Sequence, residues 1–449
     1  MRKNVIAIFD VGKTNKKLFL FDEDYQIVYE KSARFLETED EDGDPCENLE
    51  SLRLSVFDSL HEVFRREEFF IKAINFTSYG ASFVYLDESG RPLTPLYNYL
   101  KEYPVAIQEE LYKKCGGVEN FSLETASPAL GSLNSGLQIL RLKKQKPEVF
   151  EKIKTALHLP QYLSFLVSGK LYSDRTSIGC HTALWDFTKN NYHQWVLDEE
   201  LDRILAPISQ GDVVYPAAFP GATYTVGVGL HDSSSALIPY LLNFHEPFIL
   251  ISTGTWCISF NPFNDSQLTK DQLEKDTLFY LTYAGTPVKA SRLFAGQEHE
   301  TQAKRIANHF QVAAVKFRSM TMNDDLITEI KNKHSFEDQS LASFSQRPME
   351  SFSSYEEAYH VLMMDLVLAQ VASTKNVMNE VAIKRIFVDG GFSKNQLYMN
   401  LLAQFFADTE IFAASMAQAT AIGAALVIHP HWNSKPIPHD LIELKYFRA

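Results

Sequence analysis

A pattern of strand, polar glycine turn and strand occurs once in each half of this chain, and it constrains the fold more than any other feature. In the first copy, VIAIF and KKLFLF flank the turn DVGKTN at residues 10–15. In the second, FILIS and CISFN flank TGTW at residues 253–256. β-Branched and aromatic residues on both sides of a short glycine turn predict hairpins. Two similarly built α/β domains are therefore expected to face each other, with the cleft between them as the default binding site.

The first turn contains Gly12-Lys13-Thr14, which looks like the end of a nucleotide-binding P-loop. A P-loop also needs a glycine five positions before Gly12, where this chain has Ala7, and it must run from a strand into a helix. The residues after the turn favour a second strand instead. We therefore predict a hairpin turn here and no P-loop.

A hairpin turn of this composition can still bind phosphate. The backbone N–H groups around Gly12 can form an anion-binding nest, and Lys13, Lys16 or Lys17 can supply positive charge. Asp10, which directly precedes the turn, can bind a hydrated Mg²⁺. The alternative is an ordinary Asp-x-Gly turn without a ligand.

Length, charge and cysteine content limit the class of protein. A chain of 449 residues is too long for one ordinary core and predicts two or three domains. Its formal net charge of −13 argues against a nucleic-acid partner, which requires a basic surface. The four cysteines have no metal-ligand spacing and suit a reducing compartment. Because the chain as a whole is acidic, a bound polyphosphate must be neutralised locally, by a few lysines and a metal ion.

The amino-terminal segment gives no sign of export or membrane insertion. Arg2 and Lys3 precede an apolar run of only five residues before Asp10, which is too short for a signal peptide or a membrane span. We expect a cytoplasmic protein without a membrane partner. A homodimer is expected only because it is the commonest oligomeric form.

A carboxylate stands at the start of a predicted helix near the middle of the chain. The turn-rich residues 208–232 lead into SSSALIPYLL, and His231-Asp232 comes directly before this helix. Asp232 can be an N-cap that accepts helix N–H bonds. The alternative is a base that accepts the proton of a hydroxyl while that oxygen attacks phosphorus. His231 by itself is more typical of a packing residue than of a base.

Two further glycine turns are candidates for nucleotide contact. The STGTW turn at residues 252–256 offers hydroxyls and backbone N–H groups without charge. In VDGGFSKNQ, Gly390 and Gly391 separate a predicted strand from a predicted helix, where an adenine or its ribose can lie against bare backbone. A plain strand-to-helix connection uses the same glycines.

The order of these landmarks resembles the FGGY family of carbohydrate kinases over nearly the whole chain. The similarity includes SFVYLDESGRPLTP at residues 82–95, PQYLSFLVSGKLYSDRTSIGCHTALWDF at 160–187 and GLHDSSSAL at 229–237. It continues through ISTGTWCISF at 251–260 and DGGFSKNQLYMNLLAQFFADTEIFAASMAQATAIGAAL at 389–426, the most specific segment. Within the family, HDSSSA and STGTW look most like the rhamnulokinase branch, whose members phosphorylate a 6-deoxyketose.

The resemblance implies an actin-like ATPase (ribonuclease H-like) fold of two duplicated α/β domains that close over ATP, Mg²⁺ and a small sugar. Residues 1–242 would form the sugar-binding domain and residues 243–449 the nucleotide-binding domain. Asp232 would be the general base and, with Asp10, would hold the metal. The implied cofactor-binding residues are Asp10, Gly12, Lys13, Thr14, Asn15, Lys17, Thr253, Gly254, Thr255, Gly390, Gly391 and Asn395. The implied substrate residues are Thr77, Tyr79, Gly80, His231, Asp232 and Ser233.

The chain departs from the family pattern mainly around the sugar. Lys13 stands where relatives carry a small residue, and LYNYLKEYP replaces an aromatic-Arg-Asp run after PLTP. Thr77 replaces an acidic residue, and Arg292 lies near a missing asparagine. An ATP-dependent kinase for a 6-deoxyketose such as L-rhamnulose is therefore expected. The alternatives are a kinase for L-fuculose, xylulose or a polyol, a non-catalytic sugar or nucleotide sensor, and an actin-like ATPase or phosphatase that uses water as acceptor.

Overall fold

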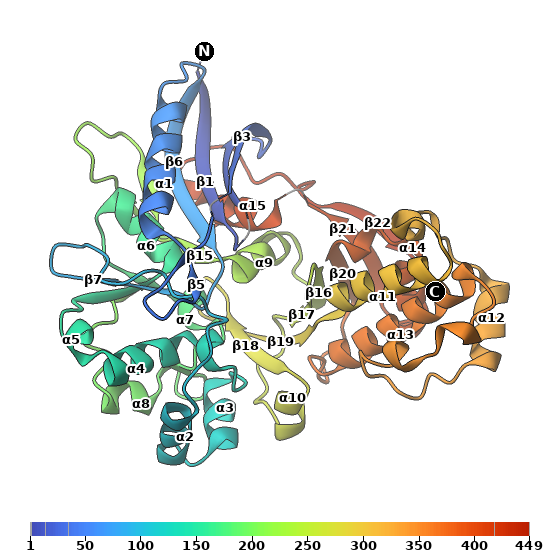
Figure 1. Cartoon of the computed structure of the whole chain (residues 1–449). Coiled ribbons are helices and arrows are strands. Elements are labelled where there is room, and N and C mark those ends of the chain that lie inside the picture. The colour runs from blue at the N-terminus through green and yellow to red at the C-terminus, as the bar shows by residue number, and fades with distance from the viewer. Residues whose placement is uncertain (1, 14, 35, 417, 449) are drawn as a thin grey trace.

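Two α/β lobes, each built on a seven-stranded mixed sheet, make up the structure, a computed structural model that describes residues 2–13, 15–34, 36–416 and 418–448 (Figure 1). The first sheet comprises β1 (Lys3–Val11), β2 (Lys16–Asp22), β3 (Ile27–Ala33), β6 (Phe69–Ser78), β13 (Val214–Pro216), β14 (Thr225–Gly227) and β15 (Leu230–His231). The second comprises β16 (Phe248–Thr253), β17 (Cys257–Asn261), β18 (Thr277–Leu281), β19 (Pro287–Leu293), β20 (Arg385–Gly390), β21 (Glu410–Ser415) and β22 (Glu443–Phe447).

The two sheets repeat one strand order. In the first, β3, β2 and β1 pair in antiparallel fashion, and β6 then pairs parallel to β1 and to β14. In the second, β19, β17 and β16 are antiparallel, and β20 pairs parallel to β16 and to β21. Both predicted hairpins are therefore confirmed, at the same place in each sheet. The predicted boundary between the two domains, at residues 242 and 243, stays a prediction.

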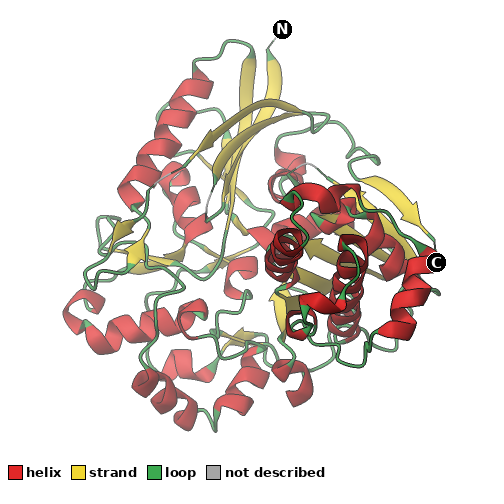
Figure 2. Ribbon diagram, turned by 45° about the vertical axis from the view of Figure 1, so that its right-hand side comes forward, coloured by secondary structure: helices red, strands yellow, loops and turns green. Residues whose placement is uncertain are grey.

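Helices form three layers around the two sheets. Helices α1 (Leu49–Phe64) and α6 (Leu159–Ser168) pack on the first sheet, and α11 (Ala295–His309), α13 (Tyr355–Lys375) and α14 (Gln396–Phe405) cover the second (Figure 2). Between the sheets lie α9 (Asp232–Asn243) and α15 (Ala419–Leu426), which pack against each other. No helix in the described parts of the chain combines the length and apolar character that crossing a bilayer requires.

The strand sequences explain this layering. In β1, Val5, Ala7 and Phe9 pack in the outer core with α1, whereas Ile6 and Ile8 pack in the central core with α9 and α15. Side chains of a strand alternate between faces, so a strand with apolar residues at every position is covered on both sides.

The remaining elements belong mostly to the part of the first lobe that lies below its sheet in Figure 1. Its helices are α2 (Val105–Lys114), α3 (Val118–Thr125), α4 (Ser135–Gln145), α5 (Pro147–Phe150), α7 (Arg175–Ile178) and α8 (Gln194–Asp198). Its short strand pairs are β4 (Thr38–Glu39) with β5 (Pro45–Cys46), β7 (Phe83–Leu86) with β8 (Thr155–His158), β9 (Ser173–Asp174) with β12 (Ile208–Ser209), and β10 (Trp185–Asp186) with β11 (Asn191–Tyr192). The second lobe adds α10 (Lys270–Glu274) and α12 (Asp324–Lys333).

Candidate functional site

Three parallel strands of the first sheet end side by side and bring the polar residues of three distant segments together. β6 lies between β1 and β15, with Thr77 opposite Asp10 on one side and Leu230 on the other. His231 pairs with Ser78, and Asp232 follows as the first residue of α9. Because parallel strands run in one direction, Asp10 and Asp232 lie at the same edge of the sheet.

Both carboxylates are held in a poorly hydrated environment. Burial raises the pKa of Asp232 from 3.8 to about 6, although Ser233 donates its backbone N–H to Asp232 Oδ1 over 2.6 Å. Burial also raises the pKa of Asp10 to about 6, with repulsion from Asp232 adding to it and a 2.7 Å hydrogen bond from the Thr420 hydroxyl opposing it. A carboxylate with a pKa near 6 is ionised at neutral pH and is a stronger base than an exposed aspartate.

Asp232 is positioned by the residue before it. The His231 backbone N–H donates to Thr176 Oγ1 over 2.9 Å, and the Thr176 hydroxyl donates to the buried Asp174. The His231 ring stacks on Tyr280 of β18, with 5.7 Å between ring centroids, and burial lowers the pKa of His231 to about 3. His231 is therefore a neutral packing and hydrogen-bonding residue in this structure.

A close approach of backbone explains Gly80. A Cβ atom at Gly80 would lie 2.9 Å from the His231 ring and 3.0 Å from Cys180 Sγ. The Cys180 thiol lies 3.0 Å from His231 Nε2, and burial raises its pKa well above 9.0. Gly80 thus allows the segment after β6 to pass directly over the residues that support Asp232.

The other predicted substrate residues differ in accessibility. The Tyr79 hydroxyl donates to Glu47 Oε1 over 2.7 Å, and the Ser233 hydroxyl lies 3.2 Å from Asp232 Oδ1. Thr77 is completely buried. Its role as a substrate residue stays a prediction, and its burial argues against direct contact.

The first glycine turn directly follows Asp10. Gly12 donates its N–H to the Asn15 carbonyl over 2.9 Å, which closes the turn between β1 and β2. The Lys13 ammonium lies 2.8 Å from Glu37, and the Lys17 ammonium lies 3.0 Å from Glu30. Lys16, the third lysine that the sequence offered, lies 3.0 Å from Glu47. All three lysines are thus ion-paired here, and each must exchange a carboxylate for a phosphate to bind it. Thr14 lies outside the described residues.

The second lobe repeats this arrangement where β16 and β20 end together. Thr253 pairs with Gly390, its hydroxyl donates to the Asp389 carbonyl, and its carbonyl accepts the Gly391 N–H over 2.9 Å. Gly390 has φ +88, and a Cβ atom there would lie 1.9 Å from the Thr253 carbonyl oxygen. Only glycine fits position 390, so Gly390 is a requirement of the backbone. At Gly391, by contrast, a Cβ atom would lie 3.9 Å from the Thr253 carbonyl oxygen, which is ordinary contact.

A cavity of about 960 Å³ opens beside these turns. Three predicted residues line it, Gly254, Gly391 and Asn395, and Asn395 also caps α14 through a hydrogen bond from the Tyr398 N–H. Lining residues that the sequence did not single out include His299, Phe317, Arg318, Phe392 and Lys394, together with Lys304, which is ion-paired with Glu300. Aromatic rings beside lysine and arginine suit a flat heteroaromatic ligand that carries negative charge.

Contacts between the lobes link the two sets of residues. Tyr280, which stacks on His231, is a strand residue of the second sheet. The positive charge of Arg292, on β19, acts to lower the pKa of Cys180 and of Tyr280, against the larger effect of burial. The Arg292 guanidinium also lies 5.4 Å from the ring of Trp256, the residue that follows the exposed Thr255. These long-range partners, like Thr420, had no local signal in the sequence, although Thr420 lies within the matched ATAIGAAL segment.

The residues at the edge of the first sheet fit a magnesium ion. Asp10 and Asp232 lie close enough for the charge of Asp232 to raise the pKa of Asp10. Two carboxylates that repel each other in a poorly hydrated environment favour a hard divalent cation, and oxygen atoms are the ligands that Mg²⁺ prefers.

Comparison with known proteins finds relatives over most of the chain. The model of the N-terminal domain of the FGGY family of carbohydrate kinases matches residues 5–212, and that of the carbohydrate kinase FGGY C-terminal domain matches residues 245–436. A rhamnulokinase from Oceanobacillus iheyensis is 25% identical over 389 residues, which cover 79% of this chain and 77% of that protein.

Solved structures share the fold at low identity. A carbohydrate kinase from Novosphingobium aromaticivorans superposes with a TM-score of 0.82 and 21% identity, covering 100% of this chain and 95% of that one. A ligand-bound xylulose kinase from Lactobacillus acidophilus gives 0.78 and 17%, covering 99% and 94%. The predicted actin-like, two-domain α/β fold is therefore confirmed.

Proposed function

We propose that this chain, which belongs to the FGGY family of carbohydrate kinases, transfers the γ-phosphate of ATP to a hydroxyl of a small ketose. The observation that carries the proposal is the placement of Asp232 at the first turn of α9, beside Asp10 and with a pKa of about 6. A base must be ionised before it can take a proton, and this carboxylate is ionised at neutral pH.

In the proposed mechanism, Asp232 accepts the proton of the acceptor hydroxyl as the hydroxyl oxygen attacks the γ-phosphorus of ATP. The bond between the γ-phosphorus and the bridging oxygen of the β-phosphate breaks, and ADP leaves. Thr176 and His231 keep the carboxylate in place through the hydrogen bonds described above. The rest of the catalysis is positioning and charge neutralisation, as in other phosphoryl transfers. Bound Mg²⁺ would neutralise phosphate charge, and Asp10 and Asp232 would hold it, Asp10 through water.

The phosphate and nucleotide roles of the turns follow from their positions. The N–H groups of the Gly12 turn and of Thr255 would contact phosphate from the two lobes. The adenosine would lie in the cavity beside Gly391 and Asn395. Lys394 and Arg318, which also line this cavity, would add positive charge near the nucleotide.

For the acceptor we propose a 6-deoxyketose such as L-rhamnulose. The support is the HDSSSA and STGTW wording and the rhamnulokinase from Oceanobacillus iheyensis. The solved structures do not favour one sugar, because their identity to this chain is too low to carry substrate information.

A coupled ADP-release assay tests the proposal with L-rhamnulose, L-fuculose, L-ribulose, D-xylulose, D-ribulose and glycerol. We expect sugar-dependent ADP production with L-rhamnulose as the best acceptor. A different ketose as the best acceptor would correct the substrate. ATP hydrolysis that no acceptor changes would reject the kinase proposal in favour of water as acceptor.

A further inference from the structure

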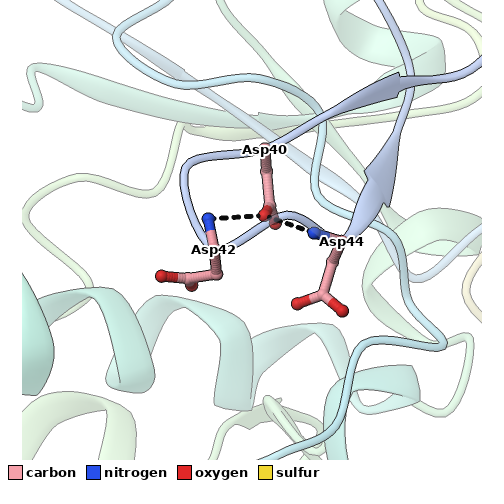
Figure 3. A group of neighbouring side chains, drawn as sticks. All are labelled: Asp40, Asp42 and Asp44. Carbon is pink, nitrogen blue, oxygen red and sulfur yellow. Dashed lines mark hydrogen bonds between the residues drawn. The ribbon is translucent and has the colours of Figure 1, made fainter.

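Three aspartates of the turn between β4 and β5 surround the ammonium group of one lysine. Lys101 Nζ lies 2.5 Å from Asp40, 2.7 Å from Asp42 and 3.0 Å from Asp44. Figure 3 shows the three carboxylates on one turn, where Asp40 also accepts the backbone N–H groups of Asp42 and Asp44. The side chains of Lys101 and Asp40 are 4% and 0% exposed. We call these four residues the Lys101 cluster.

The Lys101 cluster has the carboxylates of a cation-binding site, and the Lys101 ammonium occupies the place that a cation would take. The three carboxylates lie as close together as metal ligands would, with atoms within 4.8 Å of one another. The lysine ammonium contacts all three, and Arg141 adds a second cation 3.3 Å from Asp42. A buried ammonium surrounded by carboxylates has little freedom, so the cluster fixes the backbone of Lys101 relative to the turn.

Residues 96–101, the segment that ends at Lys101, are fixed by a backbone hydrogen bond at each end. An aromatic residue lies between these two points. At its start, the Glu47 N–H donates to the Leu96 carbonyl over 3.3 Å. At its end, the Lys101 N–H donates to the Asn98 carbonyl over 3.0 Å, which closes a tight turn over residues 98–101. Tyr99 lies within this turn and is half-buried.

Tyr99 faces the residues assigned above to the acceptor. Its ring centroid lies 5.9 Å from that of Tyr79, and the charges of Lys13 and Asp232 act on its hydroxyl. Among the described residues, none hydrogen-bonds the Tyr99 hydroxyl. A ring face with an open hydroxyl matches a neutral sugar, which presents both C–H groups and hydroxyls.

We propose that Tyr99 forms a wall of the acceptor site and that Lys101 is the positioning residue that holds it there. The inference rests on the proposed kinase function, because it assigns the acceptor to the space beside Asp232. Neither residue takes part in the chemistry, so their loss weakens sugar recognition and leaves nucleotide binding unchanged. Residues 96–101 thereby supply specificity in the segment where the chain departs from the family pattern.

A double-mutant cycle tests the link between the two residues. Lys101→Met keeps the aliphatic stem and removes the charge, and we expect it to raise the sugar KM about tenfold with the ATP KM unchanged. Tyr99→Ala should raise the sugar KM similarly. In the Tyr99→Ala background, Lys101→Met should add about twofold or less, because the wall is already lost. Independent, multiplying effects would overturn the proposal.

Matched variants separate this effect from general damage. Lys144→Met removes a lysine of the same helix as Arg141 whose ion pair, at 3.5 Å, is to Glu110 of α2, and it should leave the sugar KM unchanged. If Lys101→Met does not fold, Asp42→Asn with Asp44→Asn weakens the cluster through carboxylates that are 45% and 44% exposed. This double variant should raise the sugar KM in the same direction but by less.

Hydrogen–deuterium exchange of residues 96–103 without ligands tests the positioning independently of activity. Exchange should accelerate in Lys101→Met and not in Lys144→Met. Unchanged exchange in Lys101→Met would overturn the positioning role, whatever the kinetics. Accelerated exchange in a protein that accepts no sugar would support the positioning role and reject the kinase function, so the two failures are distinguishable.

Discussion

Replacing Asp232 by asparagine should remove activity and stabilise the protein. The side chain is 31% exposed, and burial raises the pKa of Asp232 from 3.8 to about 6. The folded state therefore disfavours the ionised carboxylate that catalysis requires. Asparagine has the same shape, and its oxygen can still accept the Ser233 N–H. The substitution removes the charge and leaves the local hydrogen bond in place.

The size and sign of the stability effect follow from this pKa. A rise from 3.8 to about 6 corresponds to about 3 kcal/mol, at about 1.36 kcal/mol for each pH unit. Between pH 3.8 and about pH 6, Asp232 is ionised in the unfolded state but still protonated in the folded state. The stability of the wild type therefore falls as pH rises from about 4 to about 6, and it stays lower at higher pH. Because part of the side chain is hydrated, we expect Asp232→Asn to gain about 1–3 kcal/mol at pH 8 and roughly half as much at pH 5.

Urea unfolding at the two pH values and sugar-dependent ADP release measure the two effects. Activity should fall by about 10² to 10⁴, the usual effect of losing a general base. Asp271→Asn is the matched control, since it removes an exposed carboxylate on α10 and should change neither quantity. Full activity in Asp232→Asn would refute the assignment of the base. A gain in stability that is equal at both pH values, or absent, would refute the argument from burial.

Three further predictions follow from the same contacts. The value of kcat/KM should fall about tenfold per pH unit below pH 6, where Asp232 becomes protonated, and a flat profile from pH 5 to pH 8 would contradict this. Gly390→Ala should abolish nucleotide binding and lower the free energy of unfolding by more than about 2 kcal/mol, as measured by thermal unfolding. Gly221→Ala is the control, because Gly221 has a similar φ of +78 but open space around it, so only the backbone strain lowers its stability. Thr176→Val removes the hydroxyl that links His231 to Asp174, and it should lower kcat about tenfold with the ATP KM unchanged. Thr188→Val removes a similar hydrogen bond to Asp186, away from the site, and should leave kcat unchanged.

The sequence predicted those parts of the fold whose signals are local. Both hairpins and the helix after Asp232 were expected and are present, because β-prone runs, glycine turns and helical spacing are properties of neighbouring residues. Residues 208–232 were expected to be rich in turns, and no strand was predicted there, yet they contain β12, β13, β14 and β15. Strands of two or three residues are too short to show alternation, and they are defined by their pairing: β12 with β9, β13 with β14, and both β14 and β15 with β6.

The site was predictable only where its residues form motifs. Asp10, Asp232 and the paired glycines stand at strand or helix ends that the sequence marks. Tyr280 and Thr420 are brought to the site by tertiary contacts, and Thr420 bonds Asp10 across 410 positions in the chain. Lys101 was seen only as part of an altered segment, because its three partners are more than fifty positions away.

The central helix pair explains how the two carboxylates keep their relative positions. α9 begins with Asp232, and α15 supplies the Thr420 hydroxyl that bonds Asp10. The two helices approach so closely that a Cβ atom at Gly423 would lie 1.9 Å from the Ser235 carbonyl oxygen. The Ser235 hydroxyl in turn donates to the Thr420 carbonyl over 2.8 Å. Because α15 follows β21 of the second sheet, we expect a shift of the second lobe to reach the support of Asp10 through this helix contact.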